Sequence, residues 1–371
     1  MAQHEVRTDP TKTLAEQPEI GHNRWHPDIP AVLSCRPGED VVLETLDALD
    51  GQAGPDATLE SLSTPDLGVV HPLTGPVYVE GAEPGDLLEV DILEVEPDTY
   101  GFTVELPGFG FLRDLFPDPY IARWEIAEGW ATSADIPGVR IPGAPFMGTI
   151  GVAPSRELME RAALRESAAA DRGGMALPPS PEGAVPASGP VAAEALRTIP
   201  PRENGGNIDI KQLCAGSRLL LPVHVPGALF SAGDAHFAQG DCETCGTAIE
   251  MRARLHARFR VRKGAASARG ITGPRFERDD YYLPPEYAAP RRFMATTGIP
   301  ITPEAENRAE DLTLAARQAL LAMIDLLGER GFTRQQAYAL CSAAVDLKVS
   351  QVVDVPNVLV SAFLPLDIFT S

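Results

Sequence analysis

Residues 233–243 (GDAHFAQGDCE) bring together side chains that can bind a metal and transfer a proton. Asp234 and His236 are two positions apart, so on an extended strand both point to the same face. Glu243 follows a Gly-Asp turn that can bring it back toward that face. An imidazole with carboxylates suits a divalent cation, and a spare glutamate suits proton transfer. We therefore predict Asp234 and His236 as ligands and Glu243 as general base, its pKa raised by burial or by the neighbouring catalytic candidate Asp241. The alternative is a solvated strand end.

A second polar pair, Asn207 and Asp209, has the same spacing and follows two glycines. If this pair faces Asp234 and His236 from a neighbouring strand, the four side chains form a mixed oxygen and nitrogen site. Such a site suits zinc, or calcium if oxygen ligands predominate. The carboxamides of Asn204 and Gln239 are candidates for hydrogen bonds to a substrate, with capping or turn roles as the alternative.

Four further segments extend this pattern along the chain, and together they resemble the acetamidase/formamidase family. They are residues 21–30 (GHNRWHPDIP), 71–79 (HPLTGPVYV), 200–209 (PPRENGGNID) and 353–357 (VDVPN). The resemblance covers residues 20–155 and 198–371. It implies hydrolysis of a small aliphatic amide, formamide or acetamide, to carboxylate and ammonia. It also implies a metal-containing site and assembly into a homo-oligomer.

The resemblance also leads to expectations about several single residues. His22, His26 and His71 lie in matching segments, so each could reach the site, and we predict that His71 binds substrate. Cys242 stands where the family typically has glycine in a Gly-Asp-Gly-Glu sequence. If that position has a positive φ, Cys242 carries backbone strain that glycine would avoid.

Two alternative functions are compatible with the same residues. A cysteine-dependent amidase would use Cys214 or Cys242 as nucleophile, and alkylation would then abolish activity. A β-rich protein that binds a metal or small molecule without catalysis would keep the Asp/His ligands and show no turnover. The five cysteines are too few and too scattered for a disulfide framework, and Cys242 and Cys245 form a lone C-x-x-C pair.

The composition narrows the class of partner. The 371 residues include 52 acidic and 31 basic side chains, a net charge of −21, which disfavours binding to nucleic acid. No apolar run approaches the ~18 residues that a membrane span needs. The polar N-terminal segment does not read as a signal peptide, so we expect a cytoplasmic protein without a membrane partner.

Hydrophobic periodicity predicts both strands and helices. Residues 249–262 alternate apolar and polar, with five arginines on the polar face, which indicates one long strand. Those arginines either face solvent or pair with acids of another subunit. Residues 156–170 favour a helix. Near the C-terminus we expect one helix capped by Thr302 and a second opened by a capping box at Thr333.

The predicted fold class is α+β, with a β-rich body of short strands and hairpins and a C-terminal helical pair. One hairpin is expected between residues 77–79 and 87–95, and long ordered loops over residues 96–150. The expected organisation has five segments. They are an N-terminal arm (1–30), a β-rich first half (31–170), an Ala/Pro/Gly linker or loop (171–200), a second β-rich half carrying the site (201–300), and a helical pair with tail (301–371).

Overall fold

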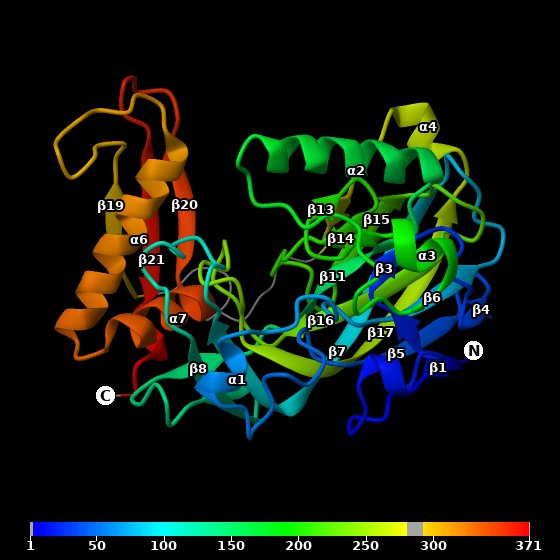
Figure 1. Cartoon of the computed structure of the whole chain (residues 1–371), viewed down its shortest axis with the longest axis horizontal. Helices are drawn as coiled ribbons and strands as arrows, with labels where there is room; N and C mark the ends of the chain where they lie inside the picture. The colour runs from blue at the N-terminus through cyan, green and yellow to red at the C-terminus, as the bar shows by residue number, and fades with distance from the viewer. Residues whose placement is uncertain (1–2, 280–291, 371) are drawn as a thin grey trace.

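A computed structural model describes residues 3–279 and 292–370 of the chain, and strands dominate it (Figure 1). The strands are β1 (Gln3–Val6), β2 (Gly21–His22), β3 (Arg24–Trp25), β4 (Leu33–Cys35), β5 (Asp40–Thr45), β6 (Leu73–Val79), β7 (Leu87–Glu105), β8 (Tyr120–Ala127), β9 (Trp130–Thr132), β10 (Arg140–Pro142), β11 (Phe146–Val152), β12 (Leu196–Arg197), β13 (Pro201–Arg202), β14 (Gly205–Asn207), β15 (Arg218–Pro222), β16 (Phe230–His236), β17 (Glu250–Arg262), β18 (Arg275–Glu277), β19 (Phe293–Gly298), β20 (Asp346–Gln351) and β21 (Leu359–Pro365). The helices are α1 (Leu59–Leu62), α2 (Arg156–Asp171), α3 (Gly189–Glu194), α4 (Ala265–Arg269), α6 (Leu312–Glu329) and α7 (Arg334–Ala344), with 3-10 turns at Leu14–Glu16 and Leu366–Ile368. The α+β, β-rich class with C-terminal helices is confirmed.

The body is built around one large sheet whose central path runs β10-β9-β8-β7-β17-β16-β11-β14-β13. The long strand β17 lies at its middle, antiparallel to both β7 and β5. Its side chains alternate between a buried apolar face and a half-exposed polar face, as the period-two pattern predicted. Strand β16 connects this centre to β11 and β6, which places its C-terminal end deep within the sheet.

The arginine face of β17 is satisfied within the chain. Arg254 Nη2 lies 2.8 Å from Glu5 Oε1, and Arg258 Nε lies 2.7 Å from Asp40 Oδ1. Arg252 Nη2 lies 2.6 Å from Asp98 Oδ2. Glu5 belongs to β1, which pairs in parallel with β5, so the start of the N-terminal arm is part of the sheet. The arginine face of β17 therefore links strands of one chain, and each half-exposed ion pair by itself contributes little to stability.

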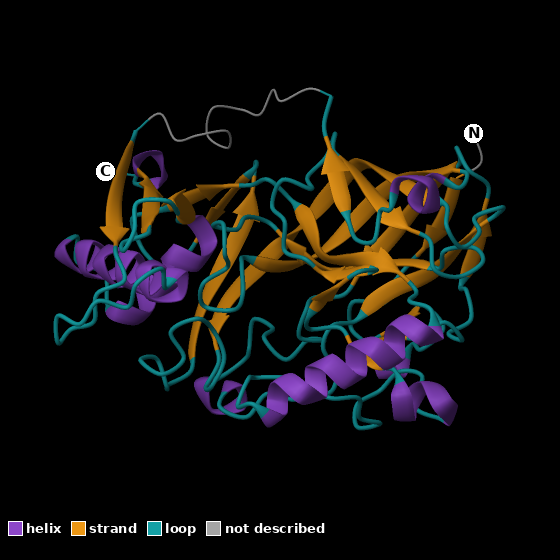
Figure 2. Cartoon of the chain, turned by 90° about the horizontal axis from the view of Figure 1, so that it is seen from above, coloured by secondary structure: helices purple, strands orange, loops and turns teal. Residues whose placement is uncertain are grey.

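A second, three-stranded sheet of order β19-β21-β20 lies with α6 and α7 at the C-terminal end of the chain (Figures 1 and 2). The sequence predicted the helices but not this sheet. Gly298 at the end of β19 explains how closely sheet and helix pack. A Cβ there would lie 2.1 Å from the carbonyl oxygen of Ala315 in α6.

Two of the three helices predicted from the sequence begin where expected. Helix α2 follows Ser155, and α7 is opened by the capping box between Thr333 and Gln336. The predicted start at Thr302 is wrong, because α6 begins at Leu312 with Asp311 Oδ1 accepting from Leu314 N at 2.9 Å. Before it, Glu310 has a positive φ that a continuous helix would not allow.

Two further expectations about the strands are wrong. Strands β6 and β7 pair with other partners rather than forming a hairpin with each other, because β6 joins β16 and β7 joins β17. Residues 96–150 are not mainly loops, since they contain the end of β7, all of β8 to β10 and most of β11. Most of their prolines and glycines lie at strand ends and between strands, whereas Pro97 and Gly101 lie within β7 and Gly148 lies within β11.

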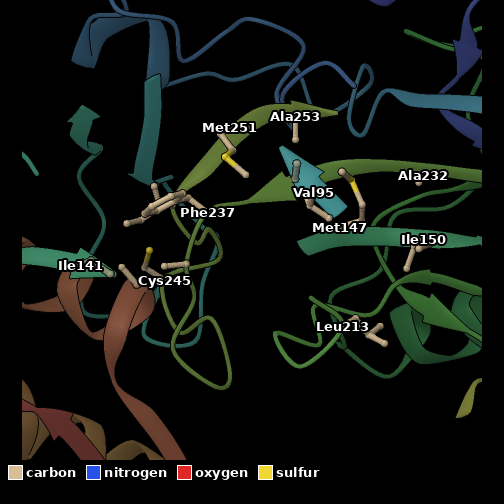
Figure 3. Packing of buried hydrophobic residues seen from close by; sticks show 14 of the residues in the cluster. Val95, Ile141, Met147, Ile150, Leu213, Ala232, Phe237, Cys245, Met251 and Ala253 are labelled. Carbon is tan, nitrogen blue, oxygen red and sulfur yellow. The ribbon is translucent and has the colours of Figure 1, made fainter. Parts of the chain in front are cut away.

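One hydrophobic cluster runs through the body and into the C-terminal helices, and Figure 3 shows part of it. Val95 and Met251 of the central strands belong to it, as do Phe237 and Cys245 of the loop after β16. Helix α7 contributes Leu340, which is completely buried. A buried side chain of this kind stabilises the fold by about 1.5–3 kcal/mol, so α7 is fastened to the body. None of the helices within residues 3–279 and 292–370 combines the length and the apolar character that a membrane span requires.

Glu105 at the end of β7 is a buried acid within this region. Only 2% of its surface is exposed, and burial raises the pKa of Glu105 to about 9. The unfolded chain ionises this group near its ordinary pKa, whereas the folded chain keeps it protonated. Unfolding therefore becomes easier as pH rises from the unfolded pKa toward the folded one.

We expect Glu105→Gln to increase the free energy of unfolding more at pH 8 than at pH 5. The difference should be on the order of 2 kcal/mol, because a shift of one pKa unit corresponds to ~1.4 kcal/mol and partial solvation reduces the total. Urea unfolding at both pH values measures it. Glu125→Gln on the exposed face of β8 is the control, and a gain independent of pH would contradict the expectation.

Candidate active site

The candidate site is centred on the imidazole of His236 at the end of β16. Its Nε2 lies 3.2 Å from Glu250 Oε2, 3.3 Å from Asp234 Oδ1 and 3.9 Å from Glu243 Oε1. Two groups of three possible metal ligands share this histidine: Asp234 with Glu250, and Asp209 with Glu243. The structure therefore brings the predicted residues Asp209, Asp234, His236 and Glu243 together.

Irregular backbone places these groups. Asp234 has a φ of 56° within β16, and Asp209 has a φ of 44° just after β14. The proximity of Asp234 and His236 is as predicted, although a left-handed residue rather than a regular pleat produces it. Strand β14 does not adjoin β16 as expected, because β11 lies between them. The second carboxylate thus reaches the site across an intervening strand.

Strand β11 makes room for this crossing at Gly148 and contributes a hydroxyl at Thr149. A Cβ at Gly148 would lie 2.5 Å from Asp209 Oδ1 and 2.9 Å from Asp234 Oδ2, so a side chain here would fill the site. Thr149 Oγ1 donates to Asp234 Oδ2 at 2.9 Å and also lies 3.1 Å from Asn207 Oδ1. Asn207 is itself oriented by a hydrogen bond from its Nδ2 to Ile199 O, which turns its oxygen toward Thr149.

Gln239 determines which nitrogen of His236 faces the carboxylates. Gln239 Nε2 donates to the carbonyl oxygen of Asp209 at 2.8 Å, so its Oε1 is the acceptor beside His236 Nδ1 at 2.9 Å. The proton on the imidazole is then held at Nδ1, and Nε2 is directed at the acidic groups. Metal-binding histidines are commonly oriented in this way by a hydrogen bond at the other nitrogen.

Charge is crowded in the site. Although burial by itself lowers the pKa of His236, Glu250 and Asp234 raise it well above its ordinary value. Burial opposes ionisation of Asp234 too, yet His71 and His236 hold its pKa below the usual range. Burial, followed by the charge of Asp234, raises the pKa of Asp209 to about 7.

The pKa values of the remaining two acids are raised as well. Burial raises the pKa of Glu250 to about 7, and burial together with Asp209 raises the pKa of Glu243 well above its ordinary value. Four carboxylates, two of them buried and two partly buried, surround one imidazole and can be neutralised by protons or by a cation. The donor set, one imidazole nitrogen with carboxylate oxygens, and the space left by Gly148 fit a divalent metal.

Other predicted residues lie beside the site or point away from it. His71 Nδ1 lies 3.5 Å from Thr149 Oγ1, and burial lowers its pKa. The Asp241 carboxylate is directed toward Gln212 and Lys211, outside both groups of possible ligands. Asn204 is buried with its Nδ2 bonded to Val152 O at 2.7 Å.

The two remaining histidines of the family segments act in packing. His22 Nε2 lies 2.7 Å from Ser231 Oγ, and His26 Nε2 lies 3.0 Å from Glu194 Oε1. Next to them, Arg24 donates to the carbonyl oxygens of Gly68 and Glu182. The segment at residues 21–30 therefore holds distant loops together instead of joining the ligand groups.

Cys242, one of the two candidate nucleophiles, lacks the surroundings of an activated thiolate. Cys242 is exposed with its Sγ near Leu347 O, and partial desolvation of the sulfur together with Asp241 raises the pKa of its thiol. A raised pKa leaves less thiolate, which is the nucleophilic form. The φ of Cys242 is 89°, so the strain expected at this position is present.

Sequence reasoning missed Glu250, Thr149 and Gly148. The sequence contained a signal for Glu250, because it is the one acid on the otherwise basic face of the alternating strand. In the structure it lies directly opposite His236 in the sheet. Thr149 and Gly148 gave no local signal. Their role depends on β11 lying between β14 and β16.

Comparison with known proteins identifies the family of this chain. The family model described as "Acetamidase/Formamidase family" matches residues 7–371. The chain belongs to this family. It is 37% identical to a formamidase of Methylophilus methylotrophus, with 98% of this chain and 93% of that protein covered. It is 39% identical to an acetamidase of Mycolicibacterium smegmatis over 89% of this chain and 87% of that protein.

The fold is shared with a gamma lactamase from Delftia acidovorans. That structure has a TM-score of 0.93 and 37% identity, with 100% of this chain and 94% of the other covered. An acetamidase from Bacillus halodurans is more distant, at 27% identity and a TM-score of 0.56. This member of the acetamidase/formamidase family is therefore an amidohydrolase, as the sequence predicted.

We expect Gln239→Leu to weaken binding of a divalent metal by about tenfold or more, because His236 loses the bond that fixes its ring. Competition of zinc with a chromophoric chelator measures the affinity. Gln212→Leu, at a glutamine whose side chain donates to the outer carboxylate of Asp241, is the control. Equal affinities for the two variants would show that Gln239 does not orient the imidazole.

Proposed function

We propose that this amidohydrolase converts formamide or acetamide to carboxylate and ammonia with a water activated by a divalent metal. The observation that carries the proposal is the arrangement of His236, whose Nδ1 is tied to Gln239 while Nε2 faces buried carboxylates. Zinc suits the imidazole, and calcium would suit the oxygen-rich remainder. A homo-oligomer and a cytoplasmic location stay predictions from the sequence.

Asp209, Asp234 and His236 would hold the metal, with Glu250 as a further carboxylate donor. The bound ion would supply Lewis acidity to the attacking water and to the amide carbonyl. Thr149 orients Asp234 through its hydroxyl, and Asn207, proposed from the sequence as a ligand, lies behind that hydroxyl with its oxygen toward the site.

Glu243 is the proposed general base. Of the three carboxylates within 4.0 Å of His236 Nε2, that of Glu243 is the farthest, at 3.9 Å, and its raised pKa favours accepting a proton. As water attacks the carbonyl carbon, its proton passes to Glu243 and a tetrahedral intermediate forms. When the C–N bond breaks, Glu243 returns the proton to nitrogen, which leaves as ammonia.

His71, whose Nδ1 lies 3.5 Å from Thr149 Oγ1, is the proposed substrate contact. Burial lowers its pKa and so favours a neutral ring, which can donate one hydrogen bond and accept another. Gln239 was also proposed to bind substrate, but both ends of its carboxamide are engaged by His236 and Asp209. These bonds favour a supporting role for Gln239.

Two other functions compete with this proposal. A cysteine mechanism through Cys214 or Cys242 has less support, because neither sulfur belongs to the groups around His236. A cyclic amide is a second candidate substrate, because the similar Delftia acidovorans protein is described as a gamma lactamase. A γ-lactam therefore belongs in any substrate panel.

Removal of metal should abolish ammonia release from formamide and acetamide, and zinc should restore it, because the metal activates the water. As-purified, chelator-stripped and restored protein are compared, with metal content measured by plasma emission. Calcium restoration distinguishes the two candidate ions. Full activity after verified removal of the metal would contradict the metal proposal. Loss of that activity on alkylation would then favour the cysteine mechanism.

We expect Glu243→Gln to lower kcat by about 10²–10⁴-fold, because the carboxamide cannot accept the proton from water. Binding of zinc should remain, since the other donors are kept. Glu160→Gln, an exposed change on α2, is the control. A variant with normal turnover and normal metal content would rule out Glu243 as the base.

A further inference from the structure

The loop that presents Glu243 is held from outside by helix α7. This loop, residues 237–249, connects β16 to β17, whereas α7 lies about a hundred residues later in the chain. Helix α7 packs against the ends of β7 and β8, at the boundary between the body and the C-terminal unit (Figure 1). The position of the proposed base therefore depends on a distant segment.

The loop backbone is in a conformation that needs outside support. Cys242 has a φ of 89° and Glu243 a φ of 44°, both in the left-handed region. Each such residue costs of order 1–3 kcal/mol and persists when surrounding contacts over-determine it. Within the loop, Glu243 N donates to Gly240 O at 3.1 Å and Gly246 N donates to Glu243 O at 2.9 Å. These turns shape the loop but do not attach it to the fold.

Ser342 of α7 attaches the loop at three points. Its Oγ accepts from Cys245 N at 3.0 Å and donates to Thr247 O at 2.6 Å. Its carbonyl oxygen accepts from Gly240 N at 2.8 Å. The side chain is completely buried, so both bonds of its hydroxyl go to the loop. The attachment points flank Glu243 on both sides.

Tyr338, one turn earlier in α7, makes the second attachment. Its hydroxyl donates to Thr244 O, the carbonyl next to Glu243, and accepts from Leu112 N at 2.8 Å. Only 1% of its surface is exposed, and its ring lies 4.3 Å from that of Phe116. The phenol thus links the loop after β16 to the segment after β7.

Gly240 allows the close approach on which these bonds depend. A Cβ at this position would lie 2.2 Å from the carbonyl oxygen of Val345, just past the end of α7. The next residue, Asp241, donates from its backbone N to Asp346 Oδ1 at 3.0 Å. The loop is thus seated on the C-terminal end of α7 as well as on its side.

We propose that Ser342 and Tyr338 are positioning residues for amide hydrolysis, because their hydroxyls hold the loop in the form that directs Glu243 at the site. The inference rests on the proposed role of Glu243 as general base. Neither hydroxyl belongs to the ligand groups around His236. Loss of either one acts on turnover through Glu243 alone.

Two single-hydroxyl deletions, Ser342→Ala and Tyr338→Phe, test the proposal with formamide as substrate. We expect kcat to fall about ten- to hundredfold, because small misplacements of a catalytic group are costly. KM should change by less than about twofold, and the zinc content should stay at that of the parent protein. If one variant fails to fold, the other decides.

The control must separate positioning from stability. Thr333→Ala removes the hydroxyl that caps the start of α7, which accepts from Gln336 N at 3.2 Å, and leaves the loop contacts in place. Such a cap change costs about 1 kcal/mol of stability. We expect this variant to melt at a lower temperature than the parent and to retain its kcat. Equal kcat losses in all three variants would overturn the positioning role.

The double variants provide the sharpest readout. In the Glu243→Gln background, adding Ser342→Ala or Tyr338→Phe should lower residual turnover by less than about twofold, because the group being positioned is already gone. Normal kcat in both hydroxyl variants, with Glu243→Gln inactive, would overturn this inference and leave the proposed function intact. Normal kcat in Glu243→Gln would overturn both.

Discussion

The crowding of four carboxylates, two buried and two partly buried, around a single imidazole is the constraint on which the rest of the site depends. Asp209, Asp234, Glu243 and Glu250 surround His236, and burial opposes the charged form of each acid. Such a group of charges is unfavourable unless protons or a cation balance it. The raised pKa values of Asp209, Glu243 and Glu250 show how protons would balance the charge. The arrangement of His236 Nε2 favours balance by a cation. An amidohydrolase can use both ways of balancing the charge, because a carboxyl group that loses its proton when a metal binds can then act as a base.

The fold meets this constraint by departing from regular structure where the acids converge. Two of them, Asp209 and Glu243, have left-handed backbones outside the strands, and Asp234 has one inside β16. Gly148 in β11 omits the side chain that would occupy the space between them. The regular strands supply rigidity, while these irregular residues direct the polar groups to one point. Strain at such positions persists because the surrounding sheet and α7 determine the backbone.

Local signals in the sequence were reliable when one segment contained the whole pattern. The alternation in residues 249–262 predicted β17, and the Thr333 capping box predicted the start of α7. The pairing partners of the strands could not be predicted from a single segment in this way. Strands β6 and β7 look like a hairpin because a Gly-containing turn separates them, yet each pairs with a strand far along the chain. Thr302 had good capping chemistry, but Asp311 began the helix because the chain between them turns at Ala305 and Glu310.

The sequence by itself predicted the chemical types of the candidate site and most of its members: Asp209, Asp234, His236 and Glu243 lie in the segments on which the resemblance to the family rests. Tertiary structure decided which nitrogen of His236 faces the acids, and that Glu250, Thr149 and Gly148 complete the site. It also decided that α7 supports the Glu243 loop. Ligand types follow from local composition, but the distance between two side chains depends on strand order and register, which are set by contacts between residues far apart in the chain.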